Sequence, residues 1–568
     1  MAMARGGRSA SIVSMAEPAT VMTPGAALEH ALAQPTLVAA FRATAAANAD
    51  RPALRMLGSD EELTFAQYAA RVRAIATGLA ALGVRAGDTV GLMYTNRPDF
   101  YLADTAVQHL GATPFSIYHT NPVDQIVPLM RNAGARIVLA QPEYEETLAE
   151  VGRRAGAPER IVTDLTELEA LPAPDGFDFE ASWRAVGAED IALLIYTSGT
   201  TGEPKGVEWS HRALLQNVVN VHRLLPASPH GRVLSYLPMA HLFERWFSHY
   251  GQTGLGYTVT CVPDAARLAE AIATVHPTRF CAVPRIYEKL AAAIDGLLAS
   301  GLSADPVRER LGFDAIEWMG SAAAPARPDT LETFDALGLK IAEIWGMSET
   351  AMSLSNPVER IKIGTVGRPM PGFEARLEPD GELCVRGPIF SGYRNDPERT
   401  AEAVDADGWM HSGDIATVDE DGYYRIVDRK KEIIINSAGK NIPPAMVEAR
   451  IKQNAPLVAH AVAIGDARPY LTALLCLDED QLRQFAEREG LAAGTHAELS
   501  QRPEVRDAVA AGIDAANATL ARIEQVKRFA ILEDAWLPGG DEVTPSLKVK
   551  RRNVITRYAD DVEALYAG

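Results

Sequence analysis

Residues Tyr196–Val207 combine glycines, hydroxyl side chains and one lysine in a way that suits phosphate binding. The segment reads Y-T-S-G-T-T-G-E-P-K-G-V and follows the apolar run Ile191–Ile195, so we expect a strand that leads into a loop with little side-chain bulk. In such a loop the backbone N–H groups can line an anion-sized concavity, and the hydroxyls add further donors. Lys205 adds a mobile positive charge. The sequence therefore predicts a polyphosphate site in this loop.

The loop departs from the Walker A pattern of kinases and GTPases. Pro204 precedes its lysine, and Gly206 follows the lysine where that pattern has Ser or Thr. We therefore expect a nucleotide loop of another design. Taken alone, the same composition would also suit a flexible linker.

Four further segments, placed in order along the chain, carry a resemblance to a known family. With them, the sequence is identified as a member of the adenylate-forming superfamily, which includes acyl-CoA synthetases, luciferases and the adenylation domains of peptide synthetases. The resemblance extends over about residues 35–568, and the four segments are Trp345–Glu349 (W-G-M-S-E), Trp409–Asp414 (W-M-H-S-G-D), Gly422–Glu432 (G-Y-Y-R-I-V-D-R-K-K-E) and Pro545–Lys548 (P-S-L-K).

Within this superfamily the chain resembles the long-chain fatty acyl-CoA synthetases. The segments that carry this closer resemblance are Pro238–Arg245 (P-M-A-H-L-F-E-R), Val283–Lys289 and Glu432–Ile442. It implies an AMP-forming acid–thiol ligase that activates a long-chain fatty acid as acyl-AMP with release of pyrophosphate. The acyl group then passes to coenzyme A with release of AMP. ATP, Mg²⁺ and coenzyme A are the implied cofactors, and no pattern gives the acyl chain length.

The first reaction would bring a carboxylate against the α-phosphate of ATP, so its site must neutralise charge and hold the reacting groups in line. We expect Lys548 to be the main catalytic residue, because one ammonium group can touch both anions. The resemblance gives the magnesium ion to Glu349 and the hydroxyl of Thr197, and hard oxygen ligands suit that ion. The full set of residues that it implies for nucleotide and cofactor binding is Thr197, Ser198, Gly199, Thr200, Thr201, Gly202, Lys205, Gly320, Ser321, Ala322, Glu343, Ile344, Trp345, Gly346, Ser348, Asp414, Arg429, Lys431, Gly439 and Lys548.

Some members of this set have more specific expected roles. Trp345 offers a flat ring on which adenine can stack, and the small residues Gly320–Ala322 would admit the purine from the other side. By the resemblance, Asp414 accepts hydrogen bonds from both ribose hydroxyls, Arg429 reaches the same ribose, and Lys431 is the hinge of a mobile C-terminal domain. A surface turn is the alternative for Gly320–Ala322.

Two expectations concern the acyl group and its acceptor. A fatty acid needs an apolar tunnel, and His241 is the residue expected to shape or gate it; a hydrogen-bonded structural histidine is the alternative. Gly439 is expected to allow close approach of pantetheine. Many relatives carry a lysine where this chain has Ile435, so we assign no lysine to the second step.

The elements that must position these residues read as an α/β fold. Thr64–Leu82 reads as a helix and Asp88–Tyr94 as a buried strand, and the alternation continues to about residue 350, which implies parallel sheets covered by helices. After Gly364, turns such as Pro379–Gly381 punctuate short β segments and predict a β-rich subdomain. We expect a disordered N-terminal tail over residues 1–30. By the resemblance, a large N-terminal adenylation domain spans residues 31–428, and a small mobile α+β domain spans residues 429–568.

Composition narrows the classes of partner and compartment. The 568 residues are 47% hydrophobic, enough for large cores, and the net charge of −19 argues against a nucleic-acid partner. The four cysteines have no metal or redox spacing, which favours reduced thiols in a cytoplasmic protein. No apolar run is long enough to span a membrane. Peripheral membrane contact and the oligomeric state stay open.

Other functions share part of this pattern. A fatty-acyl-AMP ligase that loads a separate carrier protein would keep every ATP motif, as would a ligase for another carboxylic acid. Dependence on free coenzyme A separates the first from the main hypothesis. Light emission with luciferin would indicate a luciferase. The presence of Lys548, Glu349, Asp414 and Arg429 together argues against a non-enzymatic binder.

Overall fold

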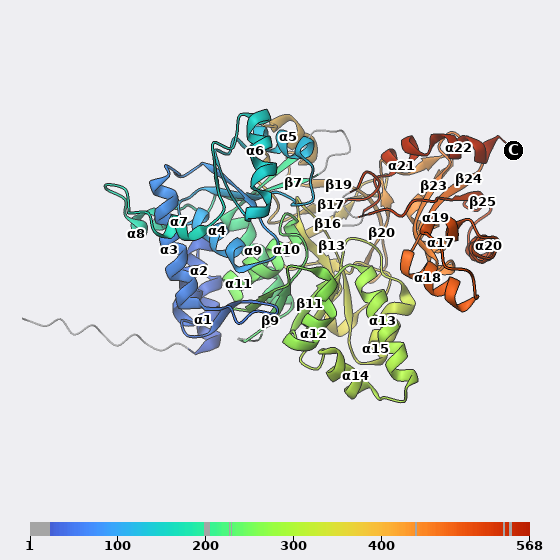
Figure 1. The fold of residues 1–568 in the computed structure, drawn as a ribbon, viewed down its shortest axis with the longest axis horizontal. Coiled ribbons are helices and arrows are strands. Elements are labelled where there is room, and N and C mark those ends of the chain that lie inside the picture. Colours follow the sequence, from blue (N-terminus) through green and yellow to red (C-terminus); the bar gives the residue numbers. More distant parts are fainter. Residues whose placement is uncertain are drawn as a thin grey trace, which may run out of the picture.

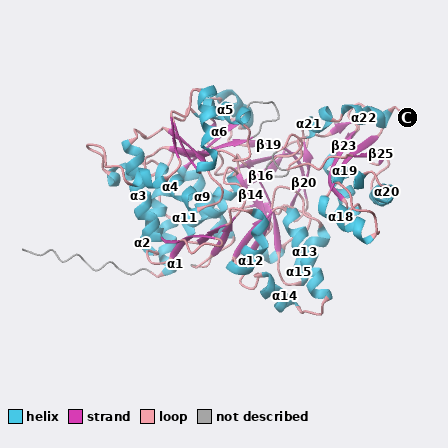
Figure 2. Cartoon of the chain, viewed as in Figure 1, coloured by secondary structure: helices cyan, strands magenta, loops and turns pink. Residues whose placement is uncertain are grey.

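The computed structural model describes residues 23–197, 205–226, 228, 230–437, 440–537, 540–544 and 548–567. Figure 1 shows an elongated molecule in which the orange and red C-terminal elements form a lobe of their own beside the rest of the chain. Helices and strands are mixed in both parts (Figure 2). The predicted α/β class is therefore confirmed.

The sheet with the most strands in the described part of the chain has seven of them, and it carries the hairpin that holds the phosphate loop. Its order is β18-β8-β7-β4-β3-β5-β6, in which β3 to β7 run parallel and β8 and β18 are antiparallel additions at one edge. Three of the inner strands are buried along their whole length, as expected of a parallel sheet covered on both faces. Its strands are β3 (Thr89–Met93), β4 (Thr113–Ser116), β5 (Ile137–Ala140), β6 (Arg160–Val162), β7 (Ile191–Thr197), β8 (Lys205–Ser210) and β18 (Gly392–Tyr393). The strands predicted at Asp88–Tyr94 and Ile191–Ile195 are thus confirmed.

Side chains cap the starts of several helices in the N-terminal part. The predicted helix at Thr64–Leu82 is α3, and the Thr64 side chain and Gln67 form a capping box at its start. The helices of this region are α1 (Pro24–Leu32), α2 (Leu37–Ala47), α3 (Phe65–Ala81), α4 (Pro98–Gln108), α5 (Val123–Ala133), η1 (Pro142–Tyr144), α6 (Glu145–Ala155), α7 (Leu165–Glu169), α8 (Phe179–Arg184), α9 (His211–Leu224), α10 (Leu242–Glu244), the π-helix η2 (Arg245–Tyr250) and α11 (Gly251–Leu255).

Two more sheets complete the α/β region. One has the order β2-β1-β10-β9 and the other the order β11-β12-β13-β14-β15. Their strands are β1 (Pro52–Met56), β2 (Glu62–Thr64), β9 (Arg232–Ser235), β10 (Thr258–Cys261), β11 (Arg279–Ala282), β12 (Trp318–Ser321), β13 (Ile341–Met347), β14 (Ala351–Ser355) and β15 (Arg368–Pro369). The helices between them are η3 (Ala265–Arg267), α12 (Leu268–Val275), α13 (Pro284–Ala299), α14 (Ala304–Leu311), α15 (Pro328–Ala336) and η4 (Val358–Arg360).

The predicted β-rich segment after Gly364 forms an antiparallel sheet of order β16-β17-β19-β20. Gly381 and Gly422 adopt positive φ at the turns that were predicted from Pro-Asp-Gly and Glu-Asp-Gly. The elements are β16 (Glu374–Leu377), β17 (Glu382–Arg386), α16 (Pro397–Ala403), β19 (Met410–Val418) and β20 (Tyr424–Arg429). The sheet brings Asp414 and Arg429 opposite each other on β19 and β20.

The C-terminal lobe has hydrophobic cores of its own. The buried residues of these cores begin at Ile434, whereas the buried cores of the rest of the chain end at Tyr424. Its elements are β21 (Ile434–Ile435), β22 (Asn441–Ile442), α17 (Pro444–Asn454), β23 (Val458–Ile464), β24 (Leu471–Leu477), α18 (Glu479–Arg488), α19 (His496–Ser500), α20 (Pro503–Ala518), β25 (Val526–Ile531), α21 (Arg551–Arg557) and α22 (Ala559–Tyr566). A division near residues 428 and 429 stays a prediction, and this separation of cores is compatible with it.

The prediction of a disordered tail over residues 1–30 is wrong at the C-terminal end of that range. Helix α1 starts at Pro24, the Thr23 side chain caps it, and Ala27, Ala31 and Leu32 are buried. Residues 1–22 lie outside the described residues. Across the ranges that the structure describes, no helix combines the length and apolarity needed to cross a membrane. The four cysteines are buried free thiols.

Candidate active site

The phosphate loop is anchored by the hairpin β7–β8. Thr197 at the end of β7 pairs with Lys205 at the start of β8, so the two residues hold the two ends of the loop together. Loop residues Ser198, Gly199, Thr200, Thr201 and Gly202 lie outside the described residues, as does Gly439. Their predicted contacts therefore stay predictions.

Lys205 lies close to Glu349, and Tyr393 lies beside both. The Lys205 Nζ atom is 5.1 Å from the centre of the Tyr393 ring, and the Tyr393 hydroxyl donates a 2.8 Å hydrogen bond to Glu349 Oε1. Burial lowers the pKa of Lys205, while the charge of Glu349 acts in the opposite direction. A positive charge and a carboxylate therefore stand next to the loop.

Glu349 is placed by a tight turn between β13 and β14. Gly346 approaches Ala351 so closely that a Cβ atom on residue 346 would lie 1.7 Å from the Ala351 carbonyl oxygen. The indole N–H of Trp209 donates a 2.8 Å hydrogen bond to the Ser348 carbonyl, which fixes the turn to β8. Glu349 itself is 7% exposed, so it is not a solvated surface carboxylate.

Asp414 joins Trp345 and Arg429. The Trp345 indole N–H donates to Asp414 Oδ2 at 2.8 Å, and Arg429 Nε lies 2.7 Å from Asp414 Oδ1. Burial raises the pKa of the Asp414 carboxyl, and the charge of Arg429 opposes this shift. The three residues predicted to contact adenosine thus form one connected group.

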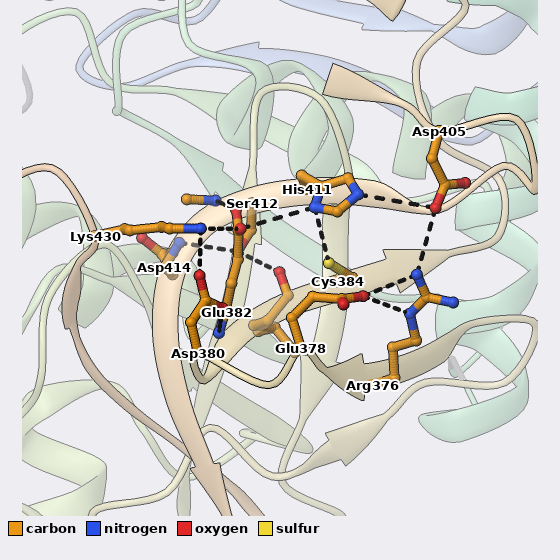
Figure 3. A network of polar contacts seen from close by, with 12 residues as sticks. Arg376, Glu378, Asp380, Glu382, Cys384, Asp405, His411, Ser412, Asp414 and Lys430 are labelled. Carbon is orange, nitrogen blue, oxygen red and sulfur yellow. Dashed lines mark hydrogen bonds and ion pairs between the residues drawn. The ribbon is translucent and has the colours of Figure 1, made fainter. Parts of the chain in front are cut away.

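A polar network extends from Asp414 to the residue before the predicted hinge (Figure 3). Lys430 Nζ lies 2.6 Å from Asp380 Oδ2 and 2.8 Å from Glu382 Oε2. The backbone N–H of Lys430 donates a 2.8 Å hydrogen bond to the Gly413 carbonyl. On the other side of Lys431, Glu432 lies 3.4 Å from Arg551 of the C-terminal lobe. Lys431 is therefore flanked by residues tied to different parts of the molecule.

A cysteine in the same network has no catalytic character. Cys384 Sγ lies 3.4 Å from His411 Nδ1 (Figure 3), an arrangement that resembles a cysteine nucleophile beside its base. Burial raises the pKa of the Cys384 thiol to about 12, so the thiol stays protonated and unreactive at neutral pH.

Lys548 comes to this site from the C-terminal lobe. The residue is exposed, and the density of protein around its ammonium, followed by the charge of Arg429, lowers its pKa, while Asp414 and Glu349 oppose the shift. The charges of all three residues act on Lys548, so it lies near both the ribose group of side chains and the metal candidate. Two ion pairs also join the lobes, Arg285 with Asp478 and Lys289 with Asp480.

His241 stands at the edge of the same site. Its Nδ1 accepts a 3.2 Å hydrogen bond from the Phe243 N–H, so it caps helix α10. Burial and the charge of Lys548 lower the pKa of His241 to about 4, which leaves the imidazole neutral at physiological pH. The residue therefore has the hydrogen bond of a structural histidine and a position beside the catalytic candidate.

Helix η2 follows His241 and α10, and its side chains line an apolar pocket. Trp246 and Phe247 contribute to the wall. The other lining residues are Val218, Val221, Gly251, Leu255, Tyr257, Arg279 and Trp318. An apolar pocket of this kind suits part of an acyl tail.

A fully buried charge network holds helix η2. Arg245 forms an ion pair with Asp104 on α4, and His249 Nε2 lies 2.9 Å from the other oxygen of the same carboxylate. Arg245 also donates to Ser116 Oγ at 2.9 Å. Burial lowers the pKa of His249 well below its usual value, so the imidazole is neutral and its Nε2–H donates to Asp104.

Other predicted residues lie in the packed interior. Gly320 belongs to β12, and a Cβ atom there would lie 2.4 Å from the Trp318 ring. Ser321 Oγ is buried, without a hydrogen-bond partner in the described part of the chain. Ile344 is part of a hydrophobic core, and Glu343 Oε2 accepts a 2.7 Å hydrogen bond from the Gly364 N–H. Among the described residues, no side-chain hydrogen bond or ion pair joins Glu343 or Ile344 to the Lys205 or Asp414 groups.

Comparison with known proteins identifies the family. Residues 41–394 match the sequence family described as AMP-binding enzyme, and residues 431–568 match the AMP-binding enzyme C-terminal domain. The chain is 44% identical over 460 residues to a putative fatty-acid–CoA ligase of Mycobacterium tuberculosis, a match that covers 73% of this chain and 80% of that protein. It is 32% identical over 562 residues to a long-chain-fatty-acid–CoA ligase of Mycobacterium bovis, with 89% and 92% covered.

Solved structures show the same fold at lower identity. ATP-bound MatB from Rhodopseudomonas palustris superimposes with a TM-score of 0.74 at 23% identity, covering 93% of this chain and 99% of that one. The adenylation domain of a carboxylate reductase from Mycobacterium chelonae gives a TM-score of 0.77 at 21% identity, with 95% and 93% covered. The large N-terminal and smaller C-terminal arrangement is therefore that of known adenylating enzymes.

Proposed function

Because the chain belongs to the AMP-binding enzyme family, we propose that it is an ATP-dependent fatty acid–CoA ligase of the AMP-forming acid–thiol class. The observation that carries the proposal is the position of Lys548, on which the charges of Asp414, Glu349 and Arg429 act. Relatives named as fatty-acid–CoA ligases support the acyl substrate, and the pocket lined by Trp246 and Phe247 supports an apolar tail.

In the first step, a carboxylate oxygen of the fatty acid attacks the α-phosphorus of ATP. The new bond is the acyl C–O–P linkage, and pyrophosphate leaves with the electron pair of the broken P–O bond. Lys548 bridges the carboxylate and the α-phosphate, which offsets their repulsion and the charge that shifts during transfer. Thr197, Lys205 and the loop between them hold the β- and γ-phosphates.

Mg²⁺ fits this site as an ion that arrives with ATP. The described residues hold no cluster of three or more metal-ligating side chains. Glu349 is a buried carboxylate beside the phosphate hairpin, and Mg²⁺ is commonly bound by one or two carboxylates together with substrate phosphates and water. Glu349 and the Thr197 hydroxyl would hold it. The ion would supply charge neutralisation on the phosphates.

The adenosine moiety fits the connected group of Trp345, Asp414 and Arg429. Among the described residues, each oxygen of Asp414 has one side-chain donor, and a carboxylate oxygen can accept more than one hydrogen bond. Both oxygens therefore keep capacity for the ribose hydroxyls. Gly320–Ala322 would face the adenine from the opposite side to Trp345.

In the second step, a thiol attacks the carbonyl carbon of the acyl-adenylate. The C–O bond breaks, AMP leaves with the electron pair, the thiol proton is released, and a thioester forms. Lys548 occupies the space beside the α-phosphate, so the C-terminal lobe must move before the thiol can approach. We infer that the C-terminal lobe turns about Lys431, because Lys430 is tied to Asp380 and Glu382 while Glu432 is tied to Arg551. Gly439 would then reach the pantetheine of coenzyme A.

The setting that we propose is the cytoplasm. The four cysteines are buried free thiols, as in reducing compartments, and no pair of them is bridged. Fatty acid, ATP and coenzyme A are the proposed partners.

Asp414→Asn is expected to weaken ATP binding by about tenfold to hundredfold. The substitution removes the negative charge beside Arg429. It also places an amide NH₂, which is a donor, against the N–H donors of Trp345 and Arg429. Isothermal titration calorimetry with ATP measures this affinity. Asp421→Asn is the control, since Asp421 is half exposed and pairs with Arg360 away from Asp414. An Asp414→Asn variant that binds ATP as tightly as the wild type would contradict the ribose assignment.

AMP release from palmitate, ATP and Mg²⁺, with and without coenzyme A, tests the proposed function. We expect turnover only when coenzyme A is present, with palmitoyl-CoA as the product. Adenylate that forms and then moves to a carrier protein rather than to coenzyme A would assign the chain to the fatty-acyl-AMP ligases. Pyrophosphate exchange with a different acid, and none with palmitate, would remove the long-chain assignment.

A further inference from the structure

Tyr393 lies at the edge of the largest sheet, next to the strand that begins with Lys205. It belongs to β18, which pairs antiparallel with β8 so that Tyr393 is opposite Val207. The side chain is 7% exposed, and its ring packs edge-on against Phe390 with centroids 4.9 Å apart. The ring is therefore held by its neighbours in one orientation.

The hydroxyl and the ring of Tyr393 contact two different members of the candidate site. The hydroxyl donates to Glu349 Oε1 at 2.8 Å, and the direction is fixed because a carboxylate only accepts. The ring centre lies 5.1 Å from the Lys205 ammonium, within the range of a cation–π contact. One side chain thus joins the metal candidate to the phosphate-binding lysine.

The backbone around Tyr393 ties the same parts together. The Phe390 N–H donates to the Glu349 carbonyl at 2.8 Å, and the Arg394 N–H donates to the Gly206 carbonyl at 2.7 Å. The segment from Phe390 to Arg394 therefore bridges the turn that carries Glu349 and the strand that carries Lys205. Its position does not depend on the Tyr393 hydroxyl, so loss of that hydroxyl should leave the local fold intact.

We propose that Tyr393 is a positioning residue that orients Glu349 for Mg²⁺ and Lys205 for the phosphates of ATP. Its hydroxyl holds Oε1 of Glu349, which leaves the other carboxylate oxygen for the cation, and its ring holds the Lys205 ammonium beside the loop. Hydrogen-bonding partners of metal-binding carboxylates commonly contribute tenfold or more to metal affinity. The inference rests on the proposed function, since it needs ATP and Mg²⁺ at this site.

Two substitutions separate the hydroxyl from the ring. Tyr393→Phe removes only the hydrogen bond to Glu349, and Tyr393→Leu also removes the ring beside Lys205. Tyr424→Phe is the matched control, because Tyr424 is 8% exposed and its hydroxyl donates to a backbone carbonyl, that of Ala375, at 3.0 Å. Tyr424 contacts neither Glu349 nor Lys205 through its hydroxyl.

The readout is ATP binding by calorimetry without fatty acid, once with Mg²⁺ and once with a chelator. We expect Tyr393→Phe to bind ATP about tenfold more weakly than the wild type when Mg²⁺ is present and equally well when it is absent. Tyr393→Leu should lose affinity in both conditions, and Tyr424→Phe in neither. In AMP formation, Tyr393→Phe should need a higher Mg²⁺ concentration for half-maximal rate.

Equal ATP affinity of Tyr393→Phe and wild type with Mg²⁺ would overturn the inference. So would an equal loss with and without Mg²⁺, which would indicate a structural role alone. These outcomes differ from a failure of the proposed function, in which the wild type would bind ATP and Mg²⁺ yet form no AMP with a fatty acid.

Discussion

Lys548→Ala is expected to lower adenylate formation from ATP and a fatty acid by about a hundredfold to a thousandfold, while ATP binding changes little. The large effect follows from the loss of a positive charge positioned where two anions must meet, and single groups of this kind are worth that much in other enzymes. ATP affinity should persist because the Asp414 group and the phosphate hairpin belong to the N-terminal part of the chain. Pyrophosphate exchange measures the first effect and calorimetry the second.

Lys550→Ala is the control for this variant. Lys550 lies two residues away, and its ammonium donates to the Gly540 carbonyl at 2.8 Å within the C-terminal lobe. It should therefore keep nearly wild-type exchange. Unchanged exchange in Lys548→Ala would remove this lysine from the mechanism.

Arg245→Met is expected to lower the free energy of unfolding by about 3–5 kcal/mol. Arg245 and Asp104 are both fully buried, so removal of the guanidinium leaves the Asp104 carboxylate without its ion-pair partner in the interior. The His249 hydrogen bond cannot replace the charge, because that imidazole is neutral. The midpoint of urea unfolding should fall accordingly. The same variant should impair use of long acyl chains, because helix η2 carries Trp246 and Phe247 to the apolar pocket.

A second variant and a control sharpen this result. Asp104→Leu/Arg245→Met removes both charges and should recover much of the lost stability, because a buried pair replaced by apolar groups is often neutral. Arg136→Met breaks an exposed pair with Glu159 and should cost about 1 kcal/mol or less. If Arg245→Met were no more destabilising than Arg136→Met, the buried network would have no structural importance.

Local patterns in the sequence were sufficient to predict the strand before the phosphate loop, the helix at Thr64–Leu82 and the turns at Gly381 and Gly422. In each case the residues that determine the element lie within a few positions of one another. The grouping of Trp345, Asp414, Arg429 and Lys548 is different, since it joins distant segments. It could be expected only through resemblance to a family.

Residues that act through distant contacts were missed. His249 lies 145 residues from Asp104, and nothing near either residue indicates the pair, because it exists only after α4 and η2 pack together. Tyr393 sits in a strand of two residues whose partner strand is almost two hundred positions earlier. Helix α1 was also missed, although Thr23 and Pro24 are typical of a helix start. Its residues were assigned to the Ala-rich segment that precedes it and to the disorder predicted there.

The most direct test of the central claim follows an oxygen atom. Palmitate labelled with ¹⁸O in both carboxylate positions is incubated with the protein, ATP, Mg²⁺ and coenzyme A. Mass spectrometry then measures the ¹⁸O content of each product. If the reaction proceeds through palmitoyl-AMP, one labelled oxygen must appear in AMP and the other in palmitoyl-CoA, since thiol attack breaks the C–O bond. Unlabelled AMP, or label in inorganic phosphate with ADP as the nucleotide product, would contradict an adenylating ligase.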